Sequence, residues 1–143
     1  MENVSEASIR VAVVDDHIMV SELLALSISK EEDLSLVGVV GNVDEALELL
    51  EREHPDVILL NYRLPDFECI EVVKLMLKAT PDSRVVMLSG NGDHELQRLA
   101  FDAGCTGLLD KHAQIAEVLG AIRAAVRGEL VISSGDSYQQ RSA

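Results

Sequence analysis

Aromatic residues are scarce in this sequence, which contains two Phe, two Tyr and no Trp among 143 residues. Hydrophobic residues nevertheless make up 48% of the chain, so the core must consist of aliphatic side chains. Such a core favours packed helices and strands of Val, Ile and Leu over an aromatic-rich β-sandwich. The length is typical of one domain and is sufficient to bury one substantial core.

Cysteine and long apolar runs are also lacking. Cys69 and Cys105 are too few for a disulfide framework or a zinc site, and we interpret them as reduced residues that fill space in the core. The sequence shows neither a signal peptide nor an apolar span long enough to cross a membrane. These absences predict a cytoplasmic protein that makes no membrane contact.

Basic residues are outnumbered, because 12 Lys and Arg stand against 25 Asp and Glu, for a formal net charge of -13. Such a charge opposes binding to the phosphates of nucleic acids and to anionic lipids. We therefore expect no direct binding of nucleic acid by this chain alone.

The stretch DVILLNYRLPD, residues 56–66, is the one around which the rest of the chain is organised. Its apolar run 57–60 follows a proline and predicts a central strand covered by helices on both faces. Asn61 ends this run, and ligands of open parallel α/β sheets bind at the carboxyl ends of the strands. Asn61 therefore lies where chemistry is expected, although an asparagine ahead of Pro65 can also simply end a strand and begin a turn.

Strands and helices are predicted to alternate along the chain. Apolar runs indicate further strands at 9–16, 36–40, 84–88 and 106–109. Apolar residues at helical spacing indicate helices at 17–30, 43–52, 68–78, 93–103 and 113–127, with Asp93 as the cap of the fourth. Five strands alternating with five helices imply an α/β fold with a doubly wound, parallel, five-stranded sheet.

One domain is expected, over residues 9–128. Residues 1–8 are polar and are expected to be disordered. Residues 129–143 become polar after Ile132 and are expected to form a linker stub or a C-terminal tail.

Polar side chains close the predicted strands. Asp15 and Asp16 end the first, Asn61 the third and Ser89 the fourth, and Lys111 follows the fifth. If the strand order is 2-1-3-4-5, these side chains meet in one crevice at the switch point of the sheet. Adjacent carboxylates repel each other unless a cation neutralises them, and oxygen ligands favour Mg²⁺. An ammonium group and a hydroxyl suit phosphoryl oxygens, so a phosphoryl site is predicted.

Each of these features alone is common, but their joint placement is specific. The sequence resembles the receiver domain of bacterial two-component response regulators over roughly residues 9–128, and the matching stretches are VAVVDDH, HPDVILLNYRLPD, VVMLSG and AGCTGLLDKHA. The stretches VVDDH, LSG and GLLDK look most like the NarL/FixJ-type subfamily, whose members usually append a helix-turn-helix domain. The resemblance implies a flavodoxin-like (βα)5 fold.

The resemblance also implies roles for the polar residues. Asp15 and Asp16 become the acidic Mg²⁺ site, and Arg63 becomes the donor of a main-chain carbonyl to the metal. Ser89 becomes the switch hydroxyl, and Lys111 becomes the lysine that contacts the phosphoryl group. The implied partners are a sensor histidine kinase or a phosphotransfer protein. Receivers also form homodimers through one of two surfaces, the helix–strand–helix face over 93–127 or the helices at 17–30 and 113–127.

Three positions depart from the family pattern, although Pro65 matches the proline of the loop. Asn61 stands at the phosphoacceptor position, Cys69 stands where a glycine is usual, and Leu108 occupies the position of the aromatic switch residue. A receiver transfers a phosphoryl group from phosphohistidine to a carboxylate oxygen of its own. A carboxamide cannot be that nucleophile, so we expect neither phosphorylation of Asn61 nor enzymatic activity. Asn61 can offer its carbonyl oxygen to Mg²⁺, but with one negative charge fewer the ion should bind more weakly.

Two origins of Asn61 remain open. It can be a phosphoablative change in an ordinary receiver, which the otherwise preserved pocket favours, or the natural residue of a pseudo-receiver that acts by binding partners. A third interpretation is a metal-dependent phosphohydrolase on a similar sheet. Such enzymes commonly place a second carboxylate two residues after the nucleophile, where this chain has His17.

Overall fold

The computed structural model describes residues 8–64, 68–90 and 94–132. Its strands are β1 (Ile9–Val14), β2 (Leu34–Val40), β3 (Val57–Asn61), β4 (Arg84–Ser89), β5 (Gly107–Asp110) and β6 (Val131–Ile132). Its helices are α2 (Ile18–Ser29), α3 (Val43–Glu53), α4 (Cys69–Ala79), α5 (His94–Ala103) and α6 (Ile115–Val126). The proposed loop residue Pro65, the cap Asp93, residues 1–7 and residues 133–143 lie outside the described residues.

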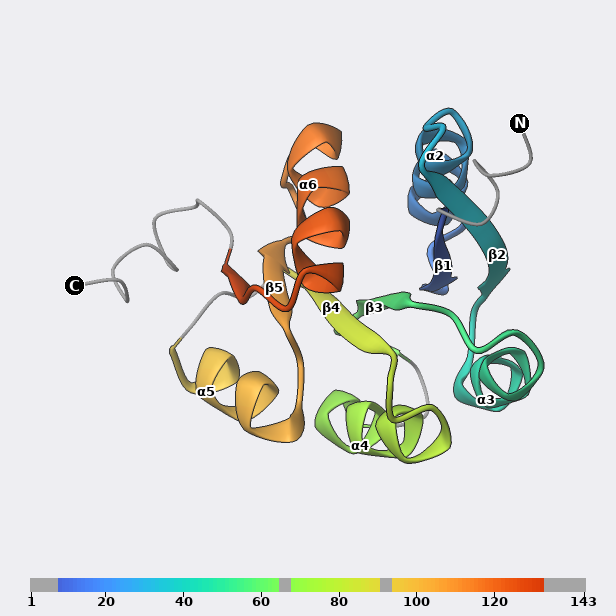
Figure 1. Ribbon diagram of the computed structural model, residues 1–143. Helices are drawn as coiled ribbons and strands as arrows, with labels where there is room; N and C mark the ends of the chain where they lie inside the picture. Colours follow the sequence, from blue (N-terminus) through green and yellow to red (C-terminus); the bar gives the residue numbers. More distant parts are fainter. Residues whose placement is uncertain (1–7, 65–67, 91–93, 133–143) are drawn as a thin grey trace.

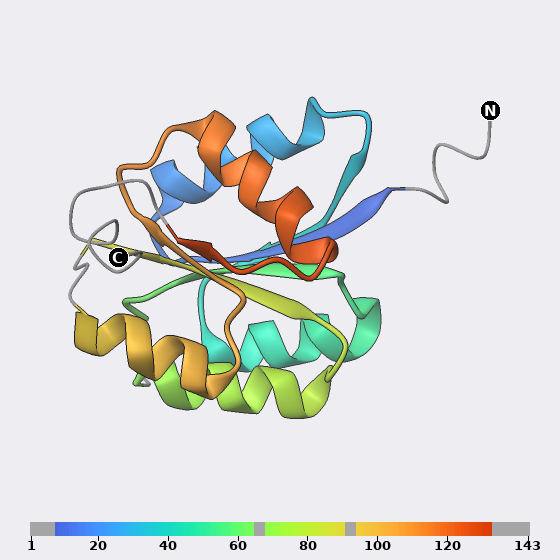
Figure 2. The same ribbon diagram turned by 60° about the vertical axis from the view of Figure 1, so that its left-hand side comes forward.

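The strands form one parallel sheet in the order β2-β1-β3-β4-β5-β6. Helices α2 and α6 cover one face, and α3, α4 and α5 cover the other (Figures 1 and 2). Right-handed crossovers between parallel strands place helices on both faces in this way. The predicted α/β fold and the strand order 2-1-3-4-5 are confirmed.

The sheet carries a short sixth strand that the sequence did not indicate. Strand β6 lies within the stretch 129–143, which was expected to be a linker stub or tail, and it pairs with β5 in parallel. The Val131 N–H donates to the Thr106 carbonyl at 2.9 Å. Two residues are too few to produce a periodic signal in the sequence. The strand exists because the free edge of β5 offers hydrogen-bonding groups, so the ordered sheet continues past residue 128.

Strand β3 is the centre of the sheet, and all five of its residues are buried. Its side chains alternate between the two faces. Ile58 and Leu60 pack in the core cluster with residues of α3, α4 and α5, whereas Val57 and Leu59 pack in the cluster with residues of α2 and α6. A strand buried on both faces is continuously apolar, which explains the run that precedes Asn61.

Boundaries differ from the predicted ones by up to two residues at most element ends. Strand β2 begins at Leu34 rather than at residue 36, because Leu34 and Ser35 pair with the first residues of β1. Helix α6 begins at Ile115 rather than at residue 113, because the Ala113 N–H donates to the Asp110 carbonyl and closes a turn there. Helix α3 begins where expected, and the Asn42 side chain caps it by accepting from the Glu45 N–H at 2.9 Å.

Gly104 follows the last residue of α5 and has a φ of +118°, a backbone conformation that residues other than glycine rarely adopt. A Cβ atom there would also lie 2.5 Å from Leu77 Cδ1. We predict that Gly104→Ala lowers the free energy of unfolding by about 2 kcal/mol in urea titrations. Gly120→Ala is the matched control, because Gly120 lies inside α6 with no atom within 4 Å of the added Cβ. It should raise stability by up to about 1 kcal/mol. Equal effects would contradict this account of Gly104.

Candidate functional site

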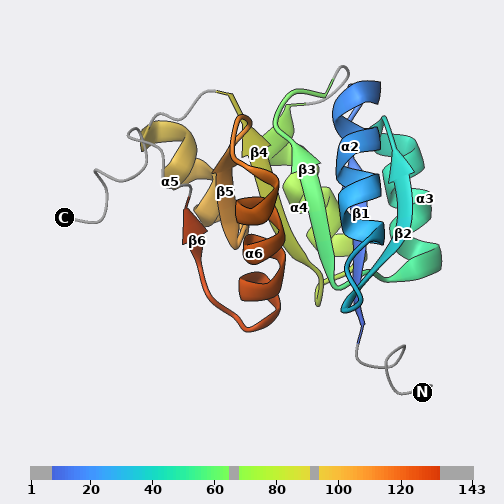
Figure 3. The same cartoon turned by 90° about the horizontal axis from the view of Figure 1, so that it is seen from above.

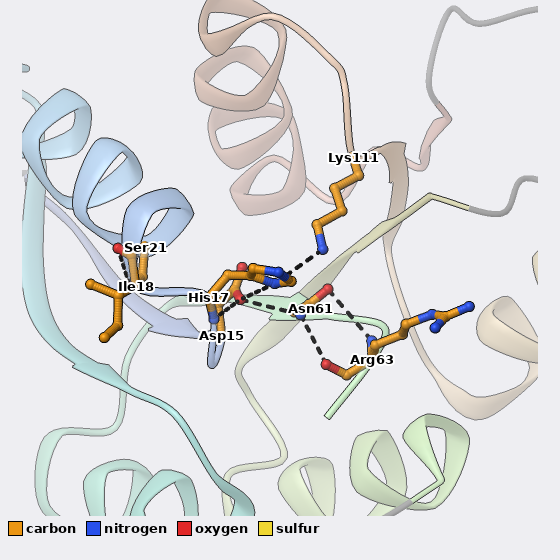
Figure 4. Close-up of polar contacts among 7 residues, drawn as sticks. All are labelled: Asp15, His17, Ile18, Ser21, Asn61, Arg63 and Lys111. Carbon is orange, nitrogen blue, oxygen red and sulfur yellow. Dashed lines mark hydrogen bonds and ion pairs between the residues drawn. The ribbon is translucent and has the colours of Figure 1, made fainter. Parts of the chain in front are cut away.

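Strand pairing brings the predicted polar residues to one edge of the sheet. Val14 pairs with Leu60, so the next residues, Asp15 and Asn61, lie side by side. Asn61 in turn pairs with Leu88, the neighbour of Ser89, on β4. The close-up in Figure 4 shows side chains from the segment after β1, from the end of β3 and from the loop after β5 converging there. At this edge, Asn61 and Lys111 line one cavity, and Asp16 lines another.

Asp15 is the buried anion of the site, with only 2% of its side chain exposed. Its Oδ1 accepts from the His17 main-chain N–H at 2.8 Å and from Asn61 Nδ2 at 3.2 Å. Its Oδ2 is buried and has no hydrogen-bond partner among the described residues. Burial raises the pKa of Asp15 above its ordinary value of 3.8, against the opposing effects of the His17 N–H and the charge of Lys111.

Asn61 presents the nitrogen of its carboxamide to the site. Nδ2 donates to Asp15 Oδ1 at 3.2 Å and to the Arg63 main-chain carbonyl at 2.9 Å. Its Oδ1 accepts from the Arg63 N–H at 3.5 Å, which is at the limit for a hydrogen bond. The side chain is 2% exposed. Both amide hydrogens are thus used by the two oxygen atoms that were predicted to bind a metal together with Asp16.

Lys111 reaches the site from the loop after β5. Its Nζ lies 3.5 Å from His17 Nδ1, and its main-chain N–H donates to the Ser89 carbonyl at 2.9 Å. His17 Nδ1 lies 3.9 Å from Asp15 Oδ1. Lys111 also lines a cavity of about 240 Å³ above Asn61. The ammonium group therefore stands over Asn61 and close enough to Asp15 to stabilise its charge.

The remaining predicted residues take different places. Asp16 is exposed at the rim of the crevice, and Ser89 is buried at the end of β4 with 1% exposure. Cys69 and Cys105 are both free and buried, as predicted. The Cys69 thiol lies 3.8 Å from the Asn61 carbonyl, and burial raises its pKa to about 12, which suits a packing residue. Leu108, in β5, is fully buried in the core.

His17 contacts more residues of the site than its position in the sequence indicated. Oxygen or nitrogen atoms of Asp15, Asp16 and His17 lie within 4.8 Å of one another. A second cavity, of about 590 Å³, opens beside them and is lined in part by Tyr62 and Leu64. The only signal in the sequence was that His17 directly follows the two aspartates. Its contact with Lys111 depends on pairing across the sheet and could not be derived from the sequence.

The donor set fits a divalent cation. The two adjacent carboxylates and the Arg63 carbonyl are hard oxygen ligands, which Mg²⁺ prefers. Asp15 Oδ2 is buried without a partner among the described residues, and a cation would relieve the cost of burying it. Within the described residues, no helix has the length and hydrophobicity that crossing a membrane requires.

The family model described as the response regulator receiver domain matches residues 11–123. The chain belongs to this family. A receiver domain uses Mg²⁺, has a histidine kinase as its partner, and serves in signalling rather than as a catalytic enzyme. The match spans all of the residues that converge in the crevice, from Asp15 to Lys111.

Relatives and solved structures agree with this assignment. The receiver is 33% identical to the uncharacterized transcriptional regulatory protein YxjL of Bacillus subtilis over 123 residues, covering 86% of this chain and 56% of that protein. It is 30% identical to the nitrate/nitrite response regulator NarL of Escherichia coli over 133 residues, covering 93% of this chain and 61% of NarL. A two-component response regulator of the LuxR family from Aurantimonas sp. superimposes with a TM-score of 0.83 at 25% identity, covering 89% of this chain and 91% of that one. The chain thus spans about 60% of the length of these curated relatives.

The raised pKa of Asp15 predicts how stability depends on pH. Because the folded receiver holds this proton more tightly than the unfolded chain, the unfolded state loses its proton first as pH rises from 3.8. The contribution of Asp15 to stability therefore falls as pH rises through its folded pKa. We predict that Asp15→Asn, measured by urea unfolding in EDTA, stabilises the receiver at pH 7, and that the difference from the unsubstituted protein shrinks toward pH 4. A variant that is less stable at pH 7 would contradict the prediction.

Proposed function

We propose that this receiver transmits signals through protein contacts and does not accept a phosphoryl group at Asn61. The observation that carries this proposal is the position of Asn61 at the carboxyl end of β3, between Asp15 and the cavity beneath Lys111. A carboxamide there is neutral, and its nitrogen rather than its oxygen faces Asp15. It lacks the negatively charged oxygen that attacks phosphorus in covalent catalysis.

The pocket around Asn61 supports its origin as a phosphoablative change in an ordinary receiver. Asp15, Asp16, Ser89 and Lys111 all stand at the ends of their strands, as a phosphoryl-accepting site requires. In a natural pseudo-receiver, the alternative origin, these residues would have no catalytic use. The similarity to NarL and to a LuxR-family regulator supports the NarL/FixJ-type subfamily.

In this proposal each pocket residue has a role toward Mg²⁺ or the phosphoryl group. Asp15 and Asp16 hold the cation, and the Arg63 carbonyl and the Asn61 side chain complete its protein ligands. When bound, Mg²⁺ offsets negative charge that develops on phosphoryl oxygens. Ser89 and Lys111 donate to those oxygens.

The remote alternative is a metal-dependent phosphohydrolase, and the place of His17 weighs against it. The residue two positions after Asp15 is this histidine, whose Nδ1 lies 3.5 Å from Lys111 Nζ, so no second carboxylate stands there. Failure to hydrolyse a generic phosphomonoester in the presence of Mg²⁺ would remove this alternative.

The proposed partners are a sensor histidine kinase or phosphotransfer protein, met in the cytoplasm, and a second copy of the receiver. The net charge of -13 argues against nucleic acid as a partner of this chain alone. The resemblance to receivers implies one of two surfaces for the homodimer, namely the face formed by α5, β5 and α6, or the face formed by α2 and α6. The second has the stronger support.

Helix α2 is apolar on its outer side as well as its inner side. Its large exposed side chains are Ile18, Met19, Leu23 and Leu26, which are 52% to 83% exposed. Glu22 is its only charged residue. A helix that is hydrophobic all round is normally covered, and an exposed apolar patch of this kind marks an interaction site.

Helix α6 offers a complementary surface beside the exposed apolar side chains of α2. It contacts α2 on the same face of the sheet (Figure 3), and its exposed positions include the small residues Ala116 and Gly120. Large exposed side chains on α2 beside small exposed residues on α6 can pack against a second copy of the same surface about a two-fold axis. We therefore assign the α2–α6 face to the homodimer.

This assignment predicts that Leu23→Glu, on α2, turns the dimer into a monomer in sedimentation velocity runs at micromolar concentration. The substitution would bury an unpaired charge at the centre of the interface. The matched control is Leu99→Glu, on the exposed surface of α5, which should leave the dimer intact. Loss of the dimer in the Leu99 variant alone would assign the interface to α5, β5 and α6 instead.

The central prediction is that Asn61→Asp accepts one phosphoryl group from acetyl phosphate and Mg²⁺. The substitution restores the attacking oxygen and adds a third carboxylate for the metal, while the other pocket residues are already present. Intact mass spectrometry should show one hydroxylamine-labile phosphoryl group on the variant and none on the Asn61 protein. Asn61→Ala is the control and should also remain unmodified.

A variant that stays unmodified under conditions that label an ordinary receiver would contradict the proposal. Cys69 or Leu108 would then have disabled the pocket as well, and the natural pseudo-receiver would be the better interpretation.

A further inference from the structure

The two oxygen atoms that Asn61 holds belong to different segments of the chain. Asp15 Oδ1 lies at the end of β1, and the Arg63 carbonyl lies in the loop after β3. Both are hydrogen-bond acceptors, so neither can bind the other directly. Only a hydrogen-bond donor or a cation can link them. In this structure that group is Nδ2 of Asn61, at 3.2 Å from the first oxygen and 2.9 Å from the second.

The Arg63 carbonyl, a predicted ligand of the cation, already accepts from Asn61 Nδ2 at 2.9 Å. A divalent cation held between this carbonyl and the Asp15 carboxylate through Oδ1 would stand where Nδ2 now stands. Turning the carboxamide by half a rotation would direct Oδ1 at both acceptors, and three oxygens would then face one another without a proton. That arrangement is stable only with a cation among them. The amide nitrogen and the cation are therefore alternatives at this place.

We propose that the Asn61 carboxamide substitutes for the divalent cation, so that the loop after β3 is held to Asp15 without metal and Mg²⁺ must displace the amide nitrogen in order to bind. This inference rests on the proposed receiver function of the same site. It differs from a simple loss of charge, because the carboxamide competes with the metal and does not merely fail to attract it. Asn61 is then a positioning residue for residues 62–64.

Comparing three side chains at position 61 distinguishes competition between the amide and Mg²⁺ from the mere loss of a negative charge. Aspartate supplies a charge and no N–H, alanine supplies neither, and the Asn61 carboxamide supplies two N–H groups and no charge. Mg²⁺ affinity should be measured by isothermal titration calorimetry and melting temperature by scanning calorimetry, both starting from protein prepared in EDTA. If only the missing charge weakens Mg²⁺ binding, the Asn61 protein and Asn61→Ala should bind the ion equally well.

The competition model predicts a different order. Asn61→Ala should bind Mg²⁺ more tightly than the Asn61 protein, because the two oxygens are free of the amide, and Asn61→Asp should bind it more tightly than both, by about tenfold or more over the Asn61 protein. In EDTA the order of stability should be reversed. The Asn61 protein should melt highest, and Asn61→Ala should melt about 3 to 6 °C lower because it loses hydrogen bonds to a buried carboxylate and a carbonyl.

Saturating Mg²⁺ should raise the melting temperature of Asn61→Asp most and that of the Asn61 protein least. Equal Mg²⁺ affinities of the Asn61 protein and Asn61→Ala would overturn the competition model, and so would equal melting temperatures of these two proteins in EDTA. If Asn61→Asp still binds Mg²⁺ and accepts a phosphoryl group in that case, the proposed receiver function stands and this inference alone fails. If Asn61→Asp does neither, the proposed function fails together with it.

Discussion

The parallel pairing of β1 with β3 is the constraint on which the site depends. It sets Val14 opposite Leu60 and thereby places the Asp15 carboxylate beside the side chain of residue 61. Both strands are buried between two helical layers, so neither can move without disrupting both core clusters. The 3.2 Å hydrogen bond between Asn61 and Asp15 is therefore imposed by the core rather than by the loops around it.

Burial of the Asp15 carboxylate beside residue 61 has a cost in free energy. Among the described residues, Asp15 keeps one buried oxygen without a hydrogen-bond partner, and burial raises the pKa of this carboxyl group. Lys111 offsets part of that cost through its charge, and the carboxamide of Asn61 offsets part through an N–H bond. A carboxylate at position 61 would add to the cost, and only a cation would compensate for it. The chemistry of one side chain thus decides whether the crevice depends on metal.

Much of this organisation follows from the sequence, because it rests on patterns that are local. The apolar run before Asn61 predicts a strand buried on both faces, and the polar residues that close each run predict the edge of the sheet where they gather. What escaped prediction depends on contacts between distant segments. Strand β6 forms only because β5 offers a free edge. The approach of Lys111 to His17 and the direction of the Asn61 amide are fixed by neighbours that no spacing in the sequence reveals.

Nuclear magnetic resonance of the Asn61 side chain tests the account most directly, because it observes the two amide hydrogens on which the account rests. In uniformly ¹⁵N-labelled protein prepared in EDTA, the pair of signals that disappears in Asn61→Asp identifies this carboxamide. The account predicts two well-separated proton signals that exchange slowly with water, since Asn61 is buried and each hydrogen is bound to an oxygen, and it predicts that saturating Mg²⁺ shifts both. Signals at the positions of an exposed asparagine, exchanging rapidly with water and unchanged by Mg²⁺, would contradict it.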